Sequence, residues 1–155
     1  MKAFYFKHLL SFHNPSGTSR GILKQKESWF IVIVQGNKTG IGECSLIKGL
    51  SPDPVKSYEQ ILKTVCENIS DGFENLSLKL NSFPSILFGL ETAFRSFESH
   101  DPLLLFPSAF TKNKDSLAIN GLIWMGEKNF MISQIKEKIN AGFDCIKIKI
   151  GSLDF

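Results

Sequence analysis

Two lysines near the end of the chain are the residues whose type and spacing best suit chemistry. They stand in the segment 145–150, CIKIKI, where charged and apolar residues alternate. Because side chains alternate between the faces of a strand, we expect Lys147 and Lys149 on one face, with the isoleucines facing an apolar layer. Two amines about 7 Å apart in a site shielded from water disfavour each other's charged form, so one can remove a proton from carbon. The same spacing also fits an edge strand whose lysine face is solvated.

Other candidate motifs carry less chemistry. The histidines and cysteines are widely spaced and form neither a CxxC nor a Cys/His pair: His8, His13, His100, Cys44, Cys66 and Cys145. The sequence therefore predicts no zinc site and no disulfide framework. Cys145 is expected to be a small buried residue. Asn120 and Trp124 share one face of a predicted strand and could approach a substrate, although packing is the simpler role for both.

The first part of the chain predicts a small antiparallel sheet followed by helices. Turn-forming residues indicate a polar loop over 14–21 and a tight turn at 36–38. Residues 29–34 are apolar at both parities, which predicts a strand covered on both faces. We expect three strands and then two helices, over residues 2–12, 29–34, 39–44, 55–69 and 84–97.

The last part of the chain predicts a β-α-β unit. A strand, a helix and a strand are expected over 117–124, 127–140 and 145–150. This order and spacing predict two parallel strands with a crossover helix. We therefore expect domains over 1–113 and 114–155. One such unit leaves both strands with open edges, so it is not a finished architecture.

Composition excludes several classes of protein. The chain has 155 residues, 43% hydrophobic and 21% charged, which is typical of a globular protein. A scattered net charge of +3 does not indicate a nucleic-acid partner. No apolar run approaches the about 20 residues that cross a bilayer, so no membrane partner is expected. An odd cysteine count and an N-terminus without a cleavage site favour a cytoplasmic location.

Six segments carry a family resemblance through their order and spacing. They are PSGTSRG (15–21), GIGECS (40–45), GLSPD (49–53), FGLETA (88–93), INGLIWMG (119–126) and GFDCIKIKIG (142–151). With them the chain resembles the N-terminal part of the enolase superfamily, in its muconate-lactonizing-enzyme-like branch and, within it, the o-succinylbenzoate synthases. The implied fold is an α+β capping domain, an antiparallel sheet plus helices, followed by the first β-α-β unit of a truncated (β/α) TIM-type barrel.

The resemblance implies roles for particular residues. The second lysine of the pair, Lys149, would transfer the proton, and the first, Lys147, would help to hold and stabilise charge. Two capping loops, over 16–20 and 46–51, would close over a small-molecule carboxylate substrate. The implied substrate-binding residues are Ser19, Arg20, Gly49, Leu50 and Ser51. Arg20 suits a planar carboxylate, but a solvated loop arginine is an equally simple interpretation. For residues 49–51, a plain segment that leads into a helix is an equally simple interpretation.

The implied reaction is a dehydration in menaquinone biosynthesis. A base removes a proton alpha to a carboxylate from 2-succinyl-6-hydroxy-2,4-cyclohexadiene-1-carboxylate, Mg²⁺ stabilises the enediolate, and loss of water gives o-succinylbenzoate. In the family the metal ligands are acidic residues on later barrel strands, which would follow residue 155. Asp144 precedes its strand and Asp154 lies in a tail, so neither replaces them. We therefore expect no metal ligands in this chain, and no Mg²⁺ binding or dehydration by the chain alone.

Two other functions stay open from the sequence. An acyl-amino-acid racemase or dipeptide epimerase of the same superfamily would share the lysine pair and the capping domain. A free-standing α+β binding module would instead be a stable monomer that unfolds cooperatively, whereas open strand edges favour self-association. The sequence does not fix the oligomeric state.

Overall fold

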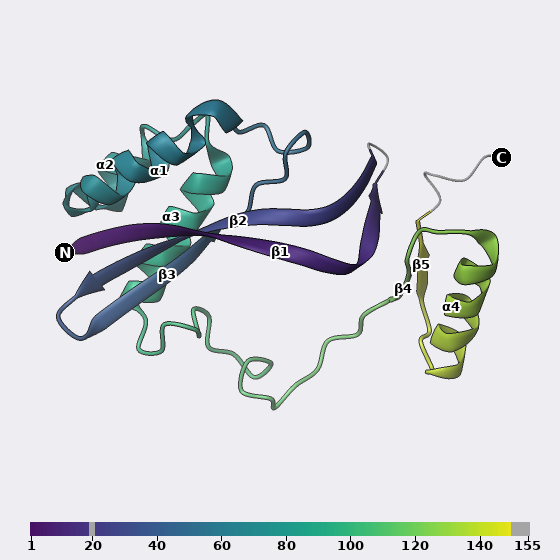
Figure 1. Ribbon diagram of the computed structural model, residues 1–155. Helices are drawn as coiled ribbons and strands as arrows, with labels where there is room; N and C mark the ends of the chain where they lie inside the picture. The colour runs from purple at the N-terminus through teal and green to yellow at the C-terminus, as the bar shows by residue number, and fades with distance from the viewer. Residues whose placement is uncertain (19–20, 150–155) are drawn as a thin grey trace.

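Two separate sheets and a long irregular connection make up the computed structural model, which describes residues 1–18 and 21–149 (Figure 1). The first sheet is antiparallel, with strand order β1-β2-β3. Its strands are β1 (Lys2–Thr18), β2 (Gly21–Gln35) and β3 (Lys38–Cys44). The second sheet pairs β4 (Gly121–Ile123) with β5 (Ile146–Ile148) in parallel. The chain therefore has the expected fold class, an α+β capping unit followed by a β-α-β unit.

The hairpin of β1 and β2 is longer than predicted. The two strands pair from Lys2↔Val34 to Thr18↔Gly21, with a register shift between Ser11 and Ser16. The loop expected over 14–21 is therefore wrong for its described residues, which continue the strands. β1 is an edge strand, where a proline without an N–H and a local bulge are both tolerated, so turn-forming residues bend the hairpin instead of ending it.

The turn between β2 and β3 is confirmed. Gln35 pairs with Lys38 across a two-residue loop, and Gly36 has φ +57°, in the left-handed region. Glycine adopts this conformation without a Cβ penalty, so the Gly-Asn pair closes the hairpin.

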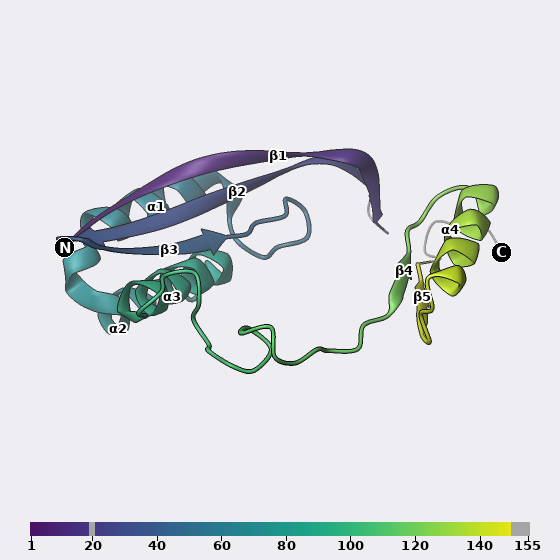
Figure 2. The ribbon, with the colours of Figure 1, turned by 90° about the horizontal axis from the view of Figure 1, so that it is seen from below.

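Three α-helices and two 3₁₀ turns follow the first sheet and cover one of its faces (Figure 2). They are η1 (Val55–Ser57), α1 (Tyr58–Glu67), η2 (Ile69–Asp71), α2 (Gly72–Ser77) and α3 (Pro84–Glu98). The two predicted helices are confirmed. A further helix, α2, begins at Gly72, where the sequence predicted only the end of the first helix. The sequence did not predict α2 because Leu76 is its only buried residue, and one buried residue gives no helical periodicity.

The core lies between the sheet and these helices. On the helix side of β2, Trp29, Ile31 and Ile33 are buried, and the Trp29 ring lies 4.9 Å from that of Tyr58 in α1. The opposite face is only partly covered: Val32 is buried, but Phe30 stacks on Phe6 of β1, which is 43% exposed. Among the described residues, the helices cover one face of this sheet only.

Glycines let α3 approach β3 closely. A Cβ at Gly42 would collide with the Gly89 carbonyl oxygen and lie 2.7 Å from the Ala93 nitrogen. A Cβ at Gly89 would in turn collide with the Cys44 sulfur. Two of the family segments, GIGECS and FGLETA, are thus the two sides of one helix-on-strand contact.

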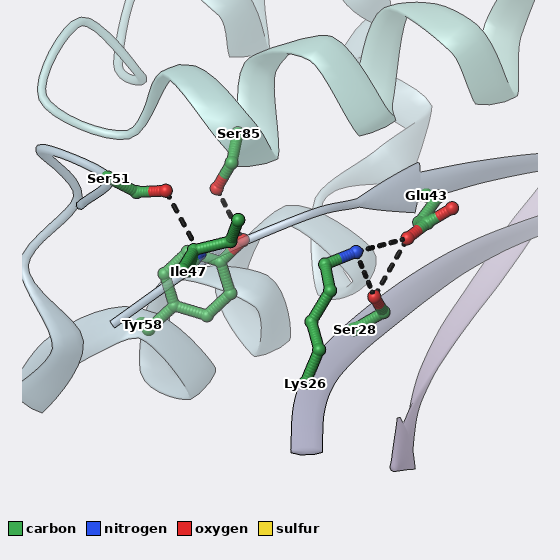
Figure 3. A network of polar contacts seen from close by, with 7 residues as sticks. All are labelled: Lys26, Ser28, Glu43, Ile47, Ser51, Tyr58 and Ser85. Atoms are coloured by element: carbon green, nitrogen blue, oxygen red, sulfur yellow. Dashed lines mark hydrogen bonds and ion pairs between the residues drawn. The ribbon is translucent and has the colours of Figure 1, made fainter. Parts of the chain in front are cut away.

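A buried aspartate from the preceding loop holds the N-terminus of α3. Asp53 is 4% exposed, and its Oδ1 accepts hydrogen bonds from the Ser85 backbone N–H at 3.0 Å and the Ser85 hydroxyl at 2.7 Å. Because the Ser85 proton goes to the carboxylate, the Tyr58 hydroxyl, 2.6 Å away, donates to Ser85 (Figure 3). The loop and both main helices are thereby joined by one chain of hydrogen bonds.

Removing the Asp53 carboxylate should destabilise this unit. We expect Asp53→Ala to lower the free energy of unfolding by about 1–3 kcal/mol, because it leaves the half-buried Ser85 donors without their acceptor. Urea unfolding followed by circular dichroism measures the change. Asp115→Ala, which removes an exposed carboxylate, is the matched control. Equal stabilities of the two variants would show that Asp53 does not hold the helix.

The β-α-β unit is confirmed, with shorter strands than predicted. α4 (Lys128–Asn140) connects β4 to β5, and each strand contributes three paired residues. Each strand has one neighbour among the described residues, and only the three residues that face this neighbour are paired. Leu117 and Ile119, expected in the strand, lie before it and are 66% and 74% exposed.

Candidate catalytic lysines and capping loop

The strand that carries the lysines is positioned by β4 and α4. Leu122 pairs with Lys147 and Ile123 pairs with Ile148 in the parallel ladder. Ile123 is fully buried beneath the helix, where Met131 is 5% exposed. Gly121 is tightly packed, since a Cβ there would lie 3.0 Å from the Phe143 ring. Local packing therefore fixes where the lysine strand begins.

Lys147 and Lys149 differ in their surroundings. Lys147 lies within β5 and is exposed, whereas Lys149 lies just beyond the carboxyl end of the strand and is half-buried. The apolar layer expected opposite the lysines is not formed by the described residues, because Ile148 is 47% exposed. Ile150, which would continue it, lies outside the described residues.

The three cysteines differ in their surroundings. Cys145 lies just before β5 and is exposed, not buried as predicted. Cys44 and Cys66 lie in the core of the first sheet. Burial raises the pKa of the Cys44 thiol and raises that of Cys66 to about 11, which keeps both protonated near neutral pH.

Trp124 lies beside Lys149, as the continued register of the two strands requires. The Lys149 Nζ is 4.9 Å from the centre of a Trp124 ring, within cation–π distance. Gln134 of α4 binds both backbone groups of Trp124: its Oε1 accepts the N–H at 2.9 Å and its Nε2 donates to the carbonyl at 3.0 Å. The sequence analysis missed Gln134, since a glutamine on a helix carries no local signal of a contact ten residues back.

The predicted capping loop after β3 is held by its own backbone. The Ile47 carbonyl accepts hydrogen bonds from the N–H groups of Leu50 at 3.0 Å and Ser51 at 2.8 Å, and the Ser51 hydroxyl accepts the Ile47 N–H at 3.0 Å (Figure 3). Gly49 has φ +80°, which favours glycine, and Leu50 is 41% exposed. Of the residues predicted to bind substrate, Gly49, Leu50 and Ser51 thus form one tight turn. Ser19 and Arg20 lie outside the described residues.

A pocket of about 260 Å³ lies beside this loop. The hairpin of β1 and β2 forms one side and the start of the loop forms the other. It is lined by Leu9, Leu23, Gln25, Lys26, Glu27, Trp29, Leu46, Ile47 and Lys48. Apolar side chains make up more than half of this lining, and Lys26, Glu27 and Lys48 add charged groups.

Charged groups around the pocket are paired. Lys48 Nζ lies 2.6 Å from Glu27 Oε2 and Lys7 Nζ lies 3.4 Å from Glu27 Oε1. The hydrogen bond from Lys48 holds the pKa of the Glu27 carboxyl below its usual value, outweighing partial desolvation. Nearby, Lys26 and Ser28 both bind Glu43 Oε1, at 3.1 Å and 2.7 Å (Figure 3).

The Glu27 pairing should give a measurable pH dependence of stability. Because the folded-state pKa lies below the ordinary value of 4.5, the pairing stabilises the fold above pH 4.5, and this contribution disappears as the pH falls through the folded-state pKa. We expect Glu27→Gln to reduce stability at pH 7 by less than about 1 kcal/mol and to have a smaller effect at pH 3. Thermal melts at both pH values measure this. Glu67→Gln, which breaks a 3.8 Å exposed pair, serves as control.

The described residues do not provide a divalent metal site. Within residues 1–18 and 21–149, no three His, Cys, Asp or Glu side chains come together in a way that could hold an ion. The same part of the chain has no helix long and apolar enough to span a membrane.

Comparison with known proteins shows which proteins the chain resembles. An o-succinylbenzoate synthase from Desulfotalea psychrophila (strain LSv54) is 32% identical over an alignment of 186 residues, which takes in all of this chain and 50% of the relative. The chain is similar to members of the enolase superfamily. It spans about half the length of the curated relative it matches, and it corresponds to the N-terminal half. No protein-family model matches the chain.

Solved structures of the enolase superfamily share this fold. MenC from Desulfotalea psychrophila LSv54 matches 97% of this chain with 49% of its own, at 26% identity and a TM-score of 0.75. An o-succinylbenzoate synthase from Thermosynechococcus elongatus BP-1, complexed with Mg in its active site, matches 99% of this chain with 44% of its own, at 12% identity and a TM-score of 0.66. Dipeptide epimerases complexed with Mg and dipeptides also share the fold.

Proposed function

We propose that this enolase-superfamily chain is the N-terminal part of an o-succinylbenzoate synthase. The enzyme would be a cytoplasmic lyase that dehydrates 2-succinyl-6-hydroxy-2,4-cyclohexadiene-1-carboxylate to o-succinylbenzoate in menaquinone biosynthesis. The observation that carries the proposal is the 32% identity to a synthase over the whole chain. Residues 1–113 would form the capping domain and 114–155 the start of the barrel.

Lys149 would carry the proton in this reaction. It lies just beyond the carboxyl end of β5, the end of a barrel strand at which catalytic groups stand. Lys147, two residues earlier, would contribute positive charge near the substrate carboxylate. The turn at Gly49, Leu50 and Ser51, with Ser19 and Arg20 of the hairpin, would close over the substrate.

Magnesium would come with other parts of the enzyme. A bound Mg²⁺ would stabilise negative charge that develops on the substrate carboxylate. The described residues do not fit such an ion, so we assign its ligands to barrel segments that this chain does not contain. Without those segments, we expect the chain to have no dehydratase activity of its own.

The alternatives have less support. An epimerase of the same superfamily shares the fold, but the epimerase structures are 15–18% identical to this chain. A free-standing binding module would not explain a match to half of a synthase along the whole chain.

A joined protein tests the proposed function. Residues 1–155 of this chain would replace the matched N-terminal half of the Desulfotalea psychrophila synthase and be fused to the C-terminal half of that enzyme. We expect the joined protein to dehydrate the substrate, which is measured by the change in ultraviolet absorbance. We expect no activity from either half alone. A joined protein that melts cooperatively yet epimerises dipeptides, or dehydrates nothing, would contradict the proposal.

A further inference from the structure

Trp124 is joined to two parts of the molecule that are far apart in sequence. Its ring contacts the Lys149 ammonium group, with Nζ 4.9 Å from the ring centre. Its indole Nε1 donates a hydrogen bond to the Pro15 carbonyl at 3.3 Å, near the end of β1. Figures 1 and 2 both show the end of this hairpin approaching β4. One side chain thus lies between the capping hairpin and the second lysine.

The backbone of Trp124 is fixed from the opposite side. Gln134 of α4 accepts its N–H at 2.9 Å and donates to its carbonyl at 3.0 Å, so both main-chain groups are bound by one amide. These bonds take the place of ladder pairing just after β4 ends at Ile123. A residue past the end of a strand is otherwise free to turn away, so the Gln134 amide determines where the indole stands.

The contact itself has a direct effect on the lysine. Lys149 also lies past the end of its strand, and a lysine side chain has four rotatable bonds. An aromatic face beside the ammonium group favours one arrangement of that side chain over the others. Among the described residues, no aromatic ring lies within cation–π distance of Lys147, which is exposed, so the two lysines are held differently although they share one pattern.

We propose that Trp124 is a positioning residue that holds the Lys149 amine at the carboxyl end of β5 and links it to the capping hairpin through Pro15. Gln134 holds Trp124 in place. The inference rests on the proposed function for its catalytic meaning, but the contact can be measured without any activity. The placement of the proton-transferring amine next to the hairpin would then depend on one side chain.

Nuclear magnetic resonance of the 155-residue chain tests the contact. The Lys149 side-chain protons should be shifted upfield by the ring current of the indole, relative to those of Lys147 in the same sample. Trp124→Leu should remove this shift and speed acylation of the Lys149 amine by roughly two- to fivefold at constant pH, measured by mass spectrometry. Trp124→Phe keeps an aromatic face without the indole N–H, and should retain most of the shift and the slower acylation.

The outcomes separate this inference from the proposed function. Equal chemical shifts for the two lysines in the unaltered chain, or loss of the shift in Trp124→Phe as complete as in Trp124→Leu, would overturn the positioning role. In the joined protein, Trp124→Leu should lower kcat more than it changes KM, and Trp124→Phe should restore kcat. A joined protein that dehydrates its substrate without Lys149 would refute the role of that lysine while leaving the contact with Trp124 intact.

Discussion

Replacing Lys149 with alanine in the joined protein should slow dehydration by roughly 10²–10⁴-fold, the contribution typical of a positioned general base. The physical reason is that the carbon-bound proton then has no acceptor within hydrogen-bond reach. Substrate binding should change less, because a base that acts on the reacting carbon contributes chiefly in the transition state. Steady-state kinetics with the ultraviolet assay measure both parameters.

Two further variants make the Lys149 result specific. Lys114→Ala removes an exposed lysine from the segment between the two sheets and should leave the rate unchanged. Lys147→Ala should raise KM as well as lower kcat, since its assigned role is to hold charge on the substrate. If Lys149→Ala and Lys114→Ala behave alike while both proteins fold, Lys149 is not the base.

Replacing Gly42 with valine should destabilise the first sheet and its helices by about 3 kcal/mol or more. The new Cβ would overlap the Gly89 carbonyl oxygen and approach the Ala93 nitrogen, which is 2.7 Å away. Both are backbone atoms of α3, so the helix as a whole must move off the strand, at a cost near the upper end of those known for overpacking. Urea unfolding of the chain, monitored by Trp29 fluorescence, measures the loss.

Gly36→Val is a useful comparison for Gly42→Val. A Cβ at Gly36 meets no atom within 4 Å, but the residue has φ +57°, so this variant carries backbone strain without a collision. Its expected cost is about 1–2 kcal/mol, smaller than that of Gly42→Val. A Gly42→Val protein as stable as the unaltered chain would mean that α3 does not pack on β3 through these glycines.

The core of the fold was largely predictable from residue patterns. The apolar run over 29–34 and the helical spacing over 84–97 reflect neighbours along the chain, and each segment lies in an element of the expected type. The hairpin end was predicted wrongly because proline, serine and glycine are typical of loops, whereas an exposed edge strand tolerates them. The helix α2 was not predicted because its single buried leucine gives no helical periodicity in the sequence.

The candidate site was predictable only in part. The K-x-K spacing pointed to Lys147 and Lys149, and the order of six short segments pointed to the superfamily, which the comparisons confirm. The different surroundings of the two lysines were not visible in that pattern. They depend on Trp124, which is brought beside Lys149 by strand pairing.

The sequence by itself determined the order of the main elements and the lysine pair. These follow from periodicity and residue type, which act between near neighbours in the chain. Only the tertiary structure decided that Asp53 binds Ser85, 32 positions away, and that Trp124 meets both Pro15 and Lys149. Such contacts depend on how separate elements pack, and no local pattern of residues encodes the partner across that distance.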